Sequence, residues 1–175
     1  MKFSCICPTY NRFPQRHYLL EESVFSFLSQ SYEDKELIII NDCPQQKLVF
    51  NHPQVFILNL PRRCRTLGEK YNLAVALSTG DYLVPWEDDD IVKPMRLAFA
   101  AEALAKSGGH YYKAIGQWFL NRNGLSRGAN FVGHNSSTYS RKAFIKSGGY
   151  PVTSFGADTL MDQKLKSFGF ITVGE

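Results

Sequence analysis

Hydrophobic residues in the first hundred positions form short runs that alternate with longer stretches of helical periodicity. The runs over 3–7 and 37–40 are almost unbroken, which is typical of strands buried on both faces of a parallel sheet. Between them, Leu20, Val24 and Phe27 recur with the spacing of one helix face. The pattern predicts strands over 3–7, 36–40, 55–58 and 81–86, and helices over 17–30, 67–79 and 94–106.

Helix-end signals support two of these helices. Thr66 followed three residues later by Glu69 forms a capping box, so we expect a helix to begin there. Gly80 stands where a helix stop is expected. Pro94 fits the first turn of the next helix, because proline is tolerated where the backbone N–H has no helical partner.

The chain after residue 107 is richer in aromatic residues and predicts a different arrangement. The segment 110–120 resembles a strand, and the turn composition of 121–124 after it predicts a hairpin. The pattern also predicts a strand over 137–140, helices over 141–146 and 158–168, and a strand that starts at 170. Without a linker or repeat, residues 1–175 are expected to form a single domain with halves 1–106 and 107–175.

This alternation predicts an α/β fold with a Rossmann-like, mostly parallel sheet flanked by helices. In such sheets ligands bind beyond the carboxyl ends of the strands. The rule brings three polar turns to one rim, namely 9–11, 41–42 and 87–90. They lie far apart in the sequence, and we expect them to be neighbours in space.

The turn 87–90 is the strongest chemical signal, because four carboxylates follow one another there. Adjacent negative charges repel, and this density of hard oxygen ligands suits Mg²⁺ or Mn²⁺, which often accompany phosphates. A solvated acidic loop, or the acidic first turn of a helix, is the alternative interpretation. The sequence therefore favours a divalent cation and a phosphorylated substrate.

Composition adds little beyond a globular domain with a real core: 175 residues, 44% hydrophobic and 21% charged. The net charge of +4 and the short basic run at 62–65 do not indicate a nucleic-acid-binding protein. That run, with Lys70 after it, fits either one anionic ligand or a solvated loop.

Cysteine usage and the chain start bear on the cellular compartment. Cys5, Cys7, Cys43 and Cys64 show no zinc-type spacing, so reduced, mostly buried thiols are expected. The start carries no signal-peptide pattern, and no apolar run approaches eighteen residues. We expect a cytoplasmic protein, for which contact with the inner face of a membrane stays compatible with the sequence.

Six segments, in this order and spacing, resemble the family 2 glycosyltransferases, which have the A-type nucleotide-sugar-binding fold. The resemblance covers nearly the whole chain. The segments are 7–12 (CPTYNR), 23–32, 37–42, 67–72 (LGEKYN), 80–90 with Pro94, and 148–150 with the helix after Asp158.

The chain departs from the family pattern at three places. The family usually has Asp-Gly-Ser where this chain has Asp42-Cys43-Pro44, and this difference affects the conformation of the loop. In the metal motif Asp-x-Asp-Asp, Glu87 takes the first place. The chain ends at Glu175 where many relatives continue, so we expect a fold that is short at its C-terminal end.

The resemblance implies roles for the donor-binding residues. Asp89 is expected to be the main ligand of Mn²⁺ or Mg²⁺, with Glu87 or Asp90 assisting it or contacting the ribose. Asp42 is expected to accept a hydrogen bond from the nucleobase; a turn aspartate bonded to its own backbone is the alternative. The remaining nucleotide-binding candidates are Thr9, Asn11 and Asp88, the diphosphate contacts Lys70 and Arg65, and Asn72, which otherwise holds adjoining loops.

Inverting members of the family use an aspartate near the start of the last helix as the general base. Asp158 fits that place, although it would also suit a helix N-cap, and Asp162 is the second candidate. His134 is a weaker candidate for a catalytic role. The aromatic rings of Trp118, Phe119 and Tyr139 suit either stacking on a sugar or packing in the core.

Together these features predict transfer of a sugar from a nucleoside-diphosphate donor to an acceptor hydroxyl, and the resemblance implies inversion at the anomeric carbon. A UDP-sugar is the favoured donor, and the acceptor is expected to be a glycan or a lipid-linked sugar in cell-surface polysaccharide synthesis. Residues 1–106 would bind the nucleotide and residues 107–175 the acceptor. A non-catalytic nucleotide-sugar or glycan-binding module, or a nucleotidyltransferase, is the alternative.

Overall fold

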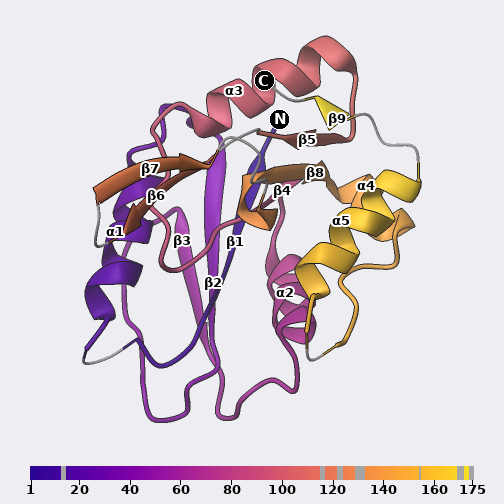
Figure 1. The fold of residues 1–175 in the computed structure, drawn as a ribbon. Helices are drawn as coiled ribbons and strands as arrows, with labels where there is room; N and C mark the ends of the chain where they lie inside the picture. The colour runs from indigo at the N-terminus through magenta and orange to yellow at the C-terminus, as the bar shows by residue number, and fades with distance from the viewer. Residues whose placement is uncertain are drawn as a thin grey trace.

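A computed structural model describes residues 1–12, 15–114, 117–121, 124–128, 133–153, 155–168 and 172–173 (Figure 1). The first half contains β1 (Phe3–Thr9), α1 (His17–Leu28), β2 (Lys35–Asn41), β3 (Val55–Asn59), α2 (Leu67–Leu77), β4 (Tyr82–Pro85) and α3 (Arg96–Ser107). The second half contains β5 (Tyr111–Lys113), β6 (Gln117–Asn121), β7 (Gly124–Gly128), the 3₁₀ helix η1 (His134–Ser136), β8 (Ser137–Ser140), α4 (Arg141–Lys146), α5 (Ala157–Ser167) and β9 (Thr172–Val173).

The main sheet has the strand order β3-β2-β1-β4-β8-β5-β9. Strand β1 pairs in parallel with β2 and β4, and β2 pairs in parallel with β3. Strand β8 runs antiparallel to both of its neighbours, β4 and β5. The predicted α/β fold with a mostly parallel sheet is therefore confirmed, and β8 is the strand that departs from parallel pairing.

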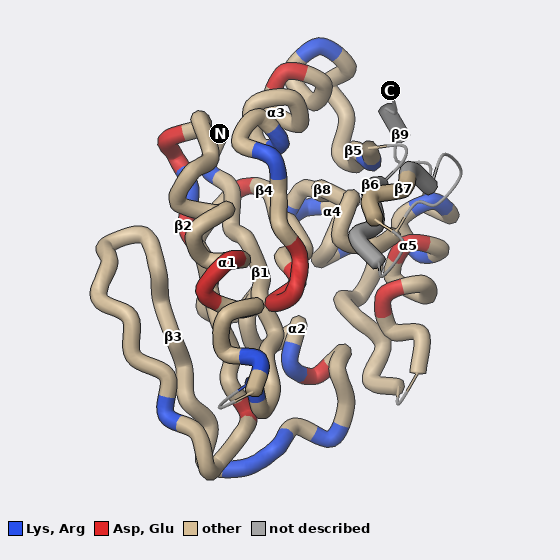
Figure 2. The backbone as a smooth tube through the Cα atoms, turned by 60° about the vertical axis from the view of Figure 1, so that its left-hand side comes forward, with Lys and Arg blue, Asp and Glu red and all other residues tan. Residues whose placement is uncertain are grey.

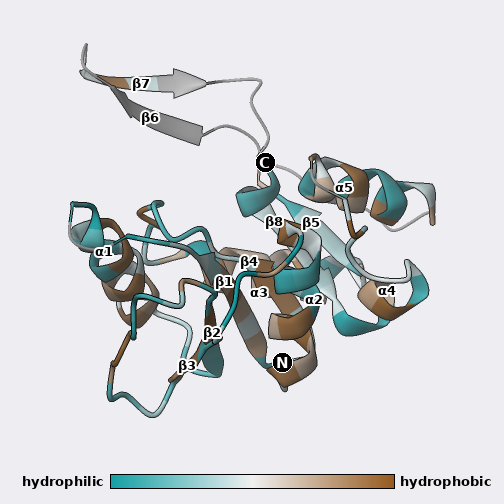
Figure 3. Cartoon of the chain, turned by 90° about the horizontal axis from the view of Figure 1, so that it is seen from below, coloured by the Kyte–Doolittle hydropathy of each residue, from teal (hydrophilic) through white to brown (hydrophobic). Residues whose placement is uncertain are grey.

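Helices cover both faces of this sheet, with α1 and α3 on one face and α2, α4 and α5 on the other (Figure 1). The alternation of strand side chains divides the core accordingly: Cys5 and Cys7 face α1 and α3, while Ile6 faces α2. Figure 3 shows hydrophobic residues concentrated in the central strands and the helices beside them. Both faces of β1 are thus buried, as its unbroken apolar run predicted.

Helix α2 begins with the capping box that the sequence predicted. The Thr66 hydroxyl accepts the Glu69 N–H at 3.1 Å, and the Glu69 carboxylate accepts the Arg65 N–H at 2.8 Å. A cap of this kind stabilises a helix by about 1 kcal/mol. It fixes the start of α2 beside the carboxyl ends of β1 and β2.

The prediction that Gly80 ends α2 is wrong. The helix is capped at Ser78, whose backbone is extended, and Gly80 lies in the connection to β4. A Cβ atom at Gly80 would lie 2.5 Å from the Ser4 hydroxyl oxygen and 2.8 Å from the Lys2 carbonyl oxygen. This position therefore requires glycine because β1 approaches closely. Pro94 also lies outside its helix, since α3 begins at Arg96.

In the second half, the predicted strand over 110–120 is divided into β5 and β6, with residues 115–116 outside the described part. The predicted hairpin is present as the antiparallel pair β6–β7, and residues 122–123 of its turn lie outside the described residues. Of the strand expected from 170, the structure describes β9. In the described parts of the chain, no helix has the length and apolar character needed to cross a membrane.

Candidate active site

The three polar turns meet at the carboxyl edge of the sheet. Thr9 ends β1, Asp42 follows β2, and the acidic turn 87–90 follows β4. The Thr9 hydroxyl donates to the Asp88 carboxylate at 2.6 Å, although 79 residues separate them. Figure 2 shows the acidic turn as a continuous red stretch beside β1. The arrangement expected from the strand order is therefore present.

Asp88 is the most buried member of the acidic turn and has a charged partner. It is 5% exposed, and the Arg12 guanidinium donates to both of its oxygens, at 2.7 and 2.6 Å. The same guanidinium reaches Asp89 at 3.0 Å, but the Asp89 side chain stays 48% exposed. Asp88 is thus neutralised within the fold, while Asp89 presents its carboxylate to solvent.

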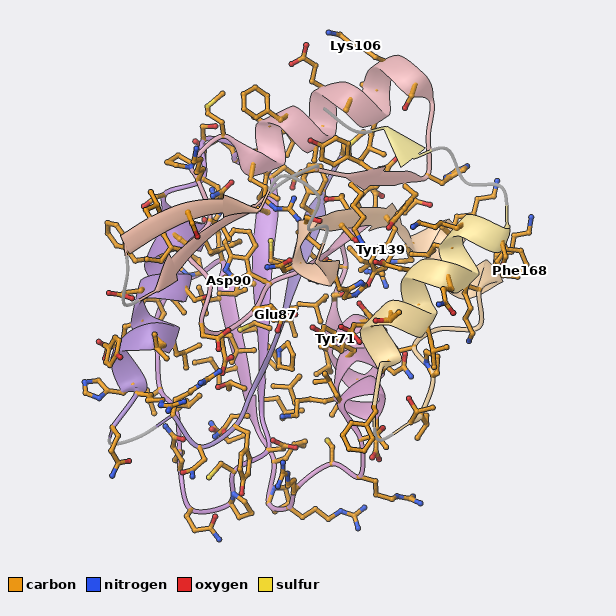
Figure 4. The ribbon with its side chains drawn as sticks, viewed as in Figure 1. Tyr71, Glu87, Asp90, Lys106, Tyr139 and Phe168 are labelled. Carbon is orange, nitrogen blue, oxygen red and sulfur yellow. The ribbon has the colours of Figure 1, made fainter. Side chains whose placement is uncertain are left out.

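The two outer carboxylates of the turn each have an uncharged partner. The Tyr71 hydroxyl donates to Glu87 at 2.7 Å, and the Asn135 amide donates to Asp90. Burial raises the pKa of both carboxyl groups, and the hydrogen bond that each accepts only partly offsets it. Figure 4 shows Glu87 and Asp90 on the same side of Tyr71.

These carboxylates suit a divalent cation that is shared with a ligand. Across the described residues, no three His, Cys, Asp or Glu side chains form a group that could hold a metal ion. Mg²⁺ is commonly bound by one or two carboxylates, with phosphate oxygens and water completing its shell. Asp89, exposed and flanked by Asp90, fits that donor set, and Asp88 does not, because Arg12 occupies both of its oxygens.

Asp42 and Lys70 form a buried ion pair at the end of β2. Lys70 Nζ lies 2.5 Å from Asp42 Oδ1 and also donates to the Thr9 carbonyl oxygen at 2.9 Å. The second Asp42 oxygen accepts the Cys64 N–H at 3.0 Å, and Asp42 is only 2% exposed. The pair holds the ends of β1 and β2 and the 61–65 loop together at the rim.

The exposed side of this rim carries an aromatic ring and several cations. Tyr10 is 37% exposed, and the Arg63 guanidinium carbon lies 4.1 Å from the centroid of its ring. Arg65 and Asn11 are exposed nearby, and Asn11 has a left-handed backbone (φ 51°) that asparagine tolerates. This rim presents an aromatic ring and positive charge, a combination that suits a base and a phosphate.

Asn72 links the two halves of the chain. Its side-chain amide donates to the Tyr150 carbonyl oxygen and accepts the Tyr150 N–H, both at 2.9 Å. Gly68, one turn earlier in α2, has the Pro151 carbonyl so close that an added Cβ would lie 2.0 Å from its oxygen. Asn72 thus joins α2 to the segment before α5, which is the alternative considered for it.

The two candidate bases lie in different environments on α5. Asp158 is in the first turn, partly exposed, and makes no hydrogen bond or ion pair with other described residues. The helix N-cap is Gly156, with φ of 67°, so the alternative reading of Asp158 as the cap residue is wrong. Asp162, one turn on, is 9% exposed and forms an ion pair with Lys113.

His134 and Tyr139 are buried near Asp162. His134 Nδ1 lies 2.9 Å from the Asp162 carboxylate, and its Nε2 lies 2.6 Å from the Tyr150 hydroxyl. Tyr139 is fully buried and packs in the core, so its ring is not available to a sugar. The side chains of Trp118 and Phe119 lie outside what the structure describes.

Sequence reasoning assigned no role to Arg12 or Tyr10, although both belong to the motif 7–12. Arg12 was recognisable only as a cation in a polar turn, and its pairing with Asp88 depends on how two distant turns meet. An exposed tyrosine directly after a strand end was the available signal for Tyr10.

Comparison with known proteins gives relatives of one kind. The family model described as glycosyl transferase family 2 matches residues 4–158. A putative colanic acid biosynthesis glycosyl transferase, WcaA, of Escherichia coli is 25% identical over 150 residues, covering 82% of this chain and 52% of that protein. An uncharacterized glycosyltransferase of Haemophilus influenzae is 34% identical over 83 residues, covering 43% of this chain and 25% of that protein. The chain thus spans between a quarter and about half of these relatives.

Solved structures share the fold at low sequence identity. S. aureus TarS 1-349 in complex with UDP-GlcNAc has a TM-score of 0.74 and 16% identity, with 100% of this chain and 59% of that chain covered. The mannosyltransferase PcManGT from Pyrobaculum calidifontis, in complex with GDP-Man and Mn²⁺, has a TM-score of 0.73 and 17% identity, with 99% and 54% covered. These neighbours confirm the A-type glycosyltransferase fold. With a family model matched over most of its length, the chain belongs to glycosyl transferase family 2.

Proposed function

We propose that this chain transfers a sugar from a nucleoside-diphosphate donor to an acceptor hydroxyl, with inversion and with help from a divalent cation. The observation that carries the proposal is the meeting of Thr9, Asp42 and the exposed carboxylate of Asp89 at one rim of the sheet. Two structural neighbours bind UDP-GlcNAc, or GDP-Man with Mn²⁺, in complexes of the same fold.

The nucleoside would lie against the ends of β1 and β2. Tyr10 offers an exposed ring on which a base can stack. Asp42 accepts one bond at each oxygen, which leaves lone pairs for a base N–H. Thr9 and Asn11 border the ribose in this proposal. A UDP-sugar is the favoured donor, because the structural neighbour TarS is solved in complex with UDP-GlcNAc and with UDP.

The diphosphate would lie between the basic loop and the acidic turn. Arg65 is exposed and supplies positive charge, and Lys70 retains one N–H beyond its bonds to Asp42 and Thr9. Asp89, assisted by Asp90 or Glu87, would hold Mn²⁺ or Mg²⁺. When bound, such a cation neutralises charge on the leaving diphosphate. Asp88 would serve this site indirectly, by fixing the turn through Thr9 and Arg12.

The acceptor would approach from the side of α5, where Asp158 is the proposed base. Its carboxylate takes the proton of the acceptor hydroxyl while that oxygen bonds to the anomeric carbon. The bond from this carbon to the diphosphate oxygen breaks on the opposite face, which inverts the configuration. Asp162 cannot share this task, because its oxygens are already bonded within the core.

In this proposal residues 1–106 bind the nucleotide and residues 107–175 face the acceptor, which is a glycan or a lipid-linked sugar. A role in polysaccharide synthesis agrees with the name of the E. coli relative. A cytoplasmic location with contact at the inner membrane face follows as part of the same proposal.

The test combines donor binding with turnover. UDP and GDP are added, with and without Mn²⁺, while the thermal midpoint is recorded; a bound ligand at 100 times its dissociation constant stabilises by about 2.7 kcal/mol. We expect a Mn²⁺-dependent shift with UDP that Asp89→Asn abolishes. Release of UDP from UDP-sugars is then measured for the wild type, Asp89→Asn and Asp158→Asn.

We expect Asp158→Asn to retain the nucleotide-induced shift while turnover falls by about 10²–10⁴-fold, the usual contribution of a general base. Tight, cation-dependent binding of UDP with no turnover for any UDP-sugar would instead support a non-catalytic binding module. Asp34→Asn, a change at an exposed residue beside the chain start, is the matched control for loss of a carboxylate.

A further inference from the structure

A chain of buried polar side chains connects the acidic turn after β4 to helix α5. We call it the Asp162 network, and it consists of Asp162, His134, Tyr150, Tyr71 and Glu87. One end, Glu87, lies in the proposed cation-binding turn, and the other end, Asp162, lies one helical turn after the proposed base. Figure 4 shows Tyr71 between Glu87 and α5.

The Asp162 end fixes α5 to three other elements. Oδ1 of Asp162 accepts from the Tyr111 and Ser137 hydroxyls, both at 3.2 Å, and lies 2.9 Å from His134 Nδ1. Oδ2 forms an ion pair with Lys113. These partners belong to β5, β8 and η1, so the carboxylate of Asp162 ties α5 to three other elements at one point.

The middle of the network combines two hydrogen bonds with one stacked pair of aromatic rings. His134 Nε2 lies 2.6 Å from the Tyr150 hydroxyl, and the Tyr150 ring stacks on Tyr71 with centroids 4.4 Å apart and an interplanar angle of 12°. The Tyr71 hydroxyl then donates to Glu87 at 2.7 Å. Burial raises the pKa of Tyr71 and Tyr150, so both hydroxyls stay protonated.

Stability alone does not account for this arrangement. Well-packed apolar residues in place of a buried ion pair are often as stable or more so, because two charges must be taken out of water. Added stability is therefore a weak explanation for the Lys113–Asp162 pair and the neighbouring imidazole, and a defined geometry is the alternative. Their position between the two parts of the proposed site indicates which geometry is defined.

We propose that Asp162, His134 and Tyr150 are positioning residues that hold Asp158 at a fixed place relative to the acidic turn. Asp158 and Asp162 are four residues apart and share one face of α5, so fixing the second fixes the first. Misplacement of a reacting group by 1 Å can reduce a rate by about 10²-fold. The inference rests on the proposed function, because it needs Asp158 to act as the base.

The first test measures coupling in the ligand-free protein. Hydrogen–deuterium exchange is compared between wild type, Asp162→Asn and Tyr150→Phe. We expect faster uptake in peptides covering 157–162 and also in those covering 84–92, at the far end of the network. Val55→Ala, a core truncation on the edge strand β3, which β2 and β1 separate from β4, is the control; it should lower the thermal midpoint without changing uptake in either region. Faster uptake in α5 alone would overturn the inference.

The second test measures turnover, as UDP release from UDP-GlcNAc, together with UDP binding by calorimetry in the presence of Mn²⁺. We expect the turnover number of Asp162→Asn to fall about 10- to 100-fold, with UDP affinity within about 2-fold of wild type. Tyr150→Phe, which keeps the stacked ring, should lose less than Tyr150→Leu.

The outcomes separate the two proposals. If wild type is active and Asp162→Asn loses no more turnover than Val55→Ala, the positioning role is wrong while the proposed function stands. A wild type that releases no nucleoside diphosphate from either UDP-sugars or GDP-sugars overturns the proposed function, and the positioning role with it, whatever the exchange experiment shows.

Discussion

The two edges of the central sheet use carboxylates in opposite ways, and the amino edge is the simpler one. There Glu36 accepts from the Ser4 hydroxyl at 2.7 Å and the Thr79 N–H at 2.6 Å, and pairs with Lys2 at 2.9 Å. Burial alone would raise its pKa, but these bonds outweigh it and lower the pKa to about 2. The charge on Glu36 is therefore fully used in holding strands and loop together.

At the carboxyl edge, the carboxylates of Glu87 and Asp90 each accept one hydrogen bond from an uncharged side chain, and burial raises the pKa of both. Asp89 remains open to solvent. Negative charge at this edge is thus only partly compensated by the fold itself. The comparison teaches that Glu36 is fully bonded within the fold, whereas Glu87, Asp89 and Asp90 keep acceptor capacity that the proposed cation would use.

The largest expected effect comes from Asp88, the buried member of the acidic turn 87–90, which has a cationic partner. Arg12→Gln would leave Asp88, 5% exposed, without its cation. Removing one partner of a buried pair costs about 3 kcal/mol. Urea unfolding at pH 7 measures this loss. A change below about 1 kcal/mol would show that Asp88 is not held by Arg12.

Gly80→Ala tests the amino edge without touching a charge. The added Cβ would lie 2.5 Å from the Ser4 oxygen that Glu36 also uses, so β1 and the loop before β4 must separate. We expect a loss of about 2 kcal/mol in thermal unfolding, with UDP binding unchanged. Gly108→Ala is the control, because no atom lies within 4 Å of its added Cβ and only its positive φ of 60° opposes the change. It should cost about 1 kcal/mol.

Glu87→Gln should change the pH dependence of stability in a cation-free buffer. A raised pKa means that stability tied to Glu87 is fully present below its ordinary value of 4.5 and is lost as pH rises through the folded-state value. Glutamine does not ionise, so the variant avoids this loss of stability. We expect the variant to gain stability relative to wild type as pH rises from 4 to 7. A gain that is equal at both pH values would contradict the assignment.

Glu36→Gln should do the reverse, with the smallest effect. A lowered pKa gives stability that is present above 4.5 and is lost as pH falls through about 2. The variant should be less stable than wild type by about 1 kcal/mol at pH 7, after allowance for solvent screening, and this difference should shrink as pH falls from 4.5 toward 2. Chemical unfolding across this range measures both arms, and a difference as large at pH 2 as at pH 7 would contradict the prediction.

Much of the fold was predictable because its signals are local. The apolar runs of β1 and β2 predicted strands buried on both faces, and Thr66 with Glu69 predicted the start of α2. The rim was predictable because the strand order of a parallel sheet determines which turns meet. The end of α2 and the start of α3 were not predictable from Gly80 and Pro94. Gly80 is required by the close approach of β1, and Pro94 lies in the turn that precedes α3.

The details of the site depended on contacts between distant segments. Arg12 meets Asp88 across 76 residues, and Lys113 meets Asp162 across 49. Periodicity placed Asp162 on α5 but could not distinguish a rim residue from one enclosed by β5, β8 and η1. Whether Asp162 is exposed or enclosed depends on how the second half packs, and its short strands give weaker sequence patterns.

The thiols of this chain offer a native attachment point for a reporter. Cys5, Cys7 and Cys43 are buried, whereas Cys64 is partly exposed and its backbone N–H bonds to Asp42. Burial raises the pKa of the Cys64 thiol, so maleimide coupling would be faster in mildly alkaline buffer. A fluorophore placed there would sit beside Asp42, at the rim proposed to bind the nucleoside, so its emission would test that proposal without any engineered cysteine.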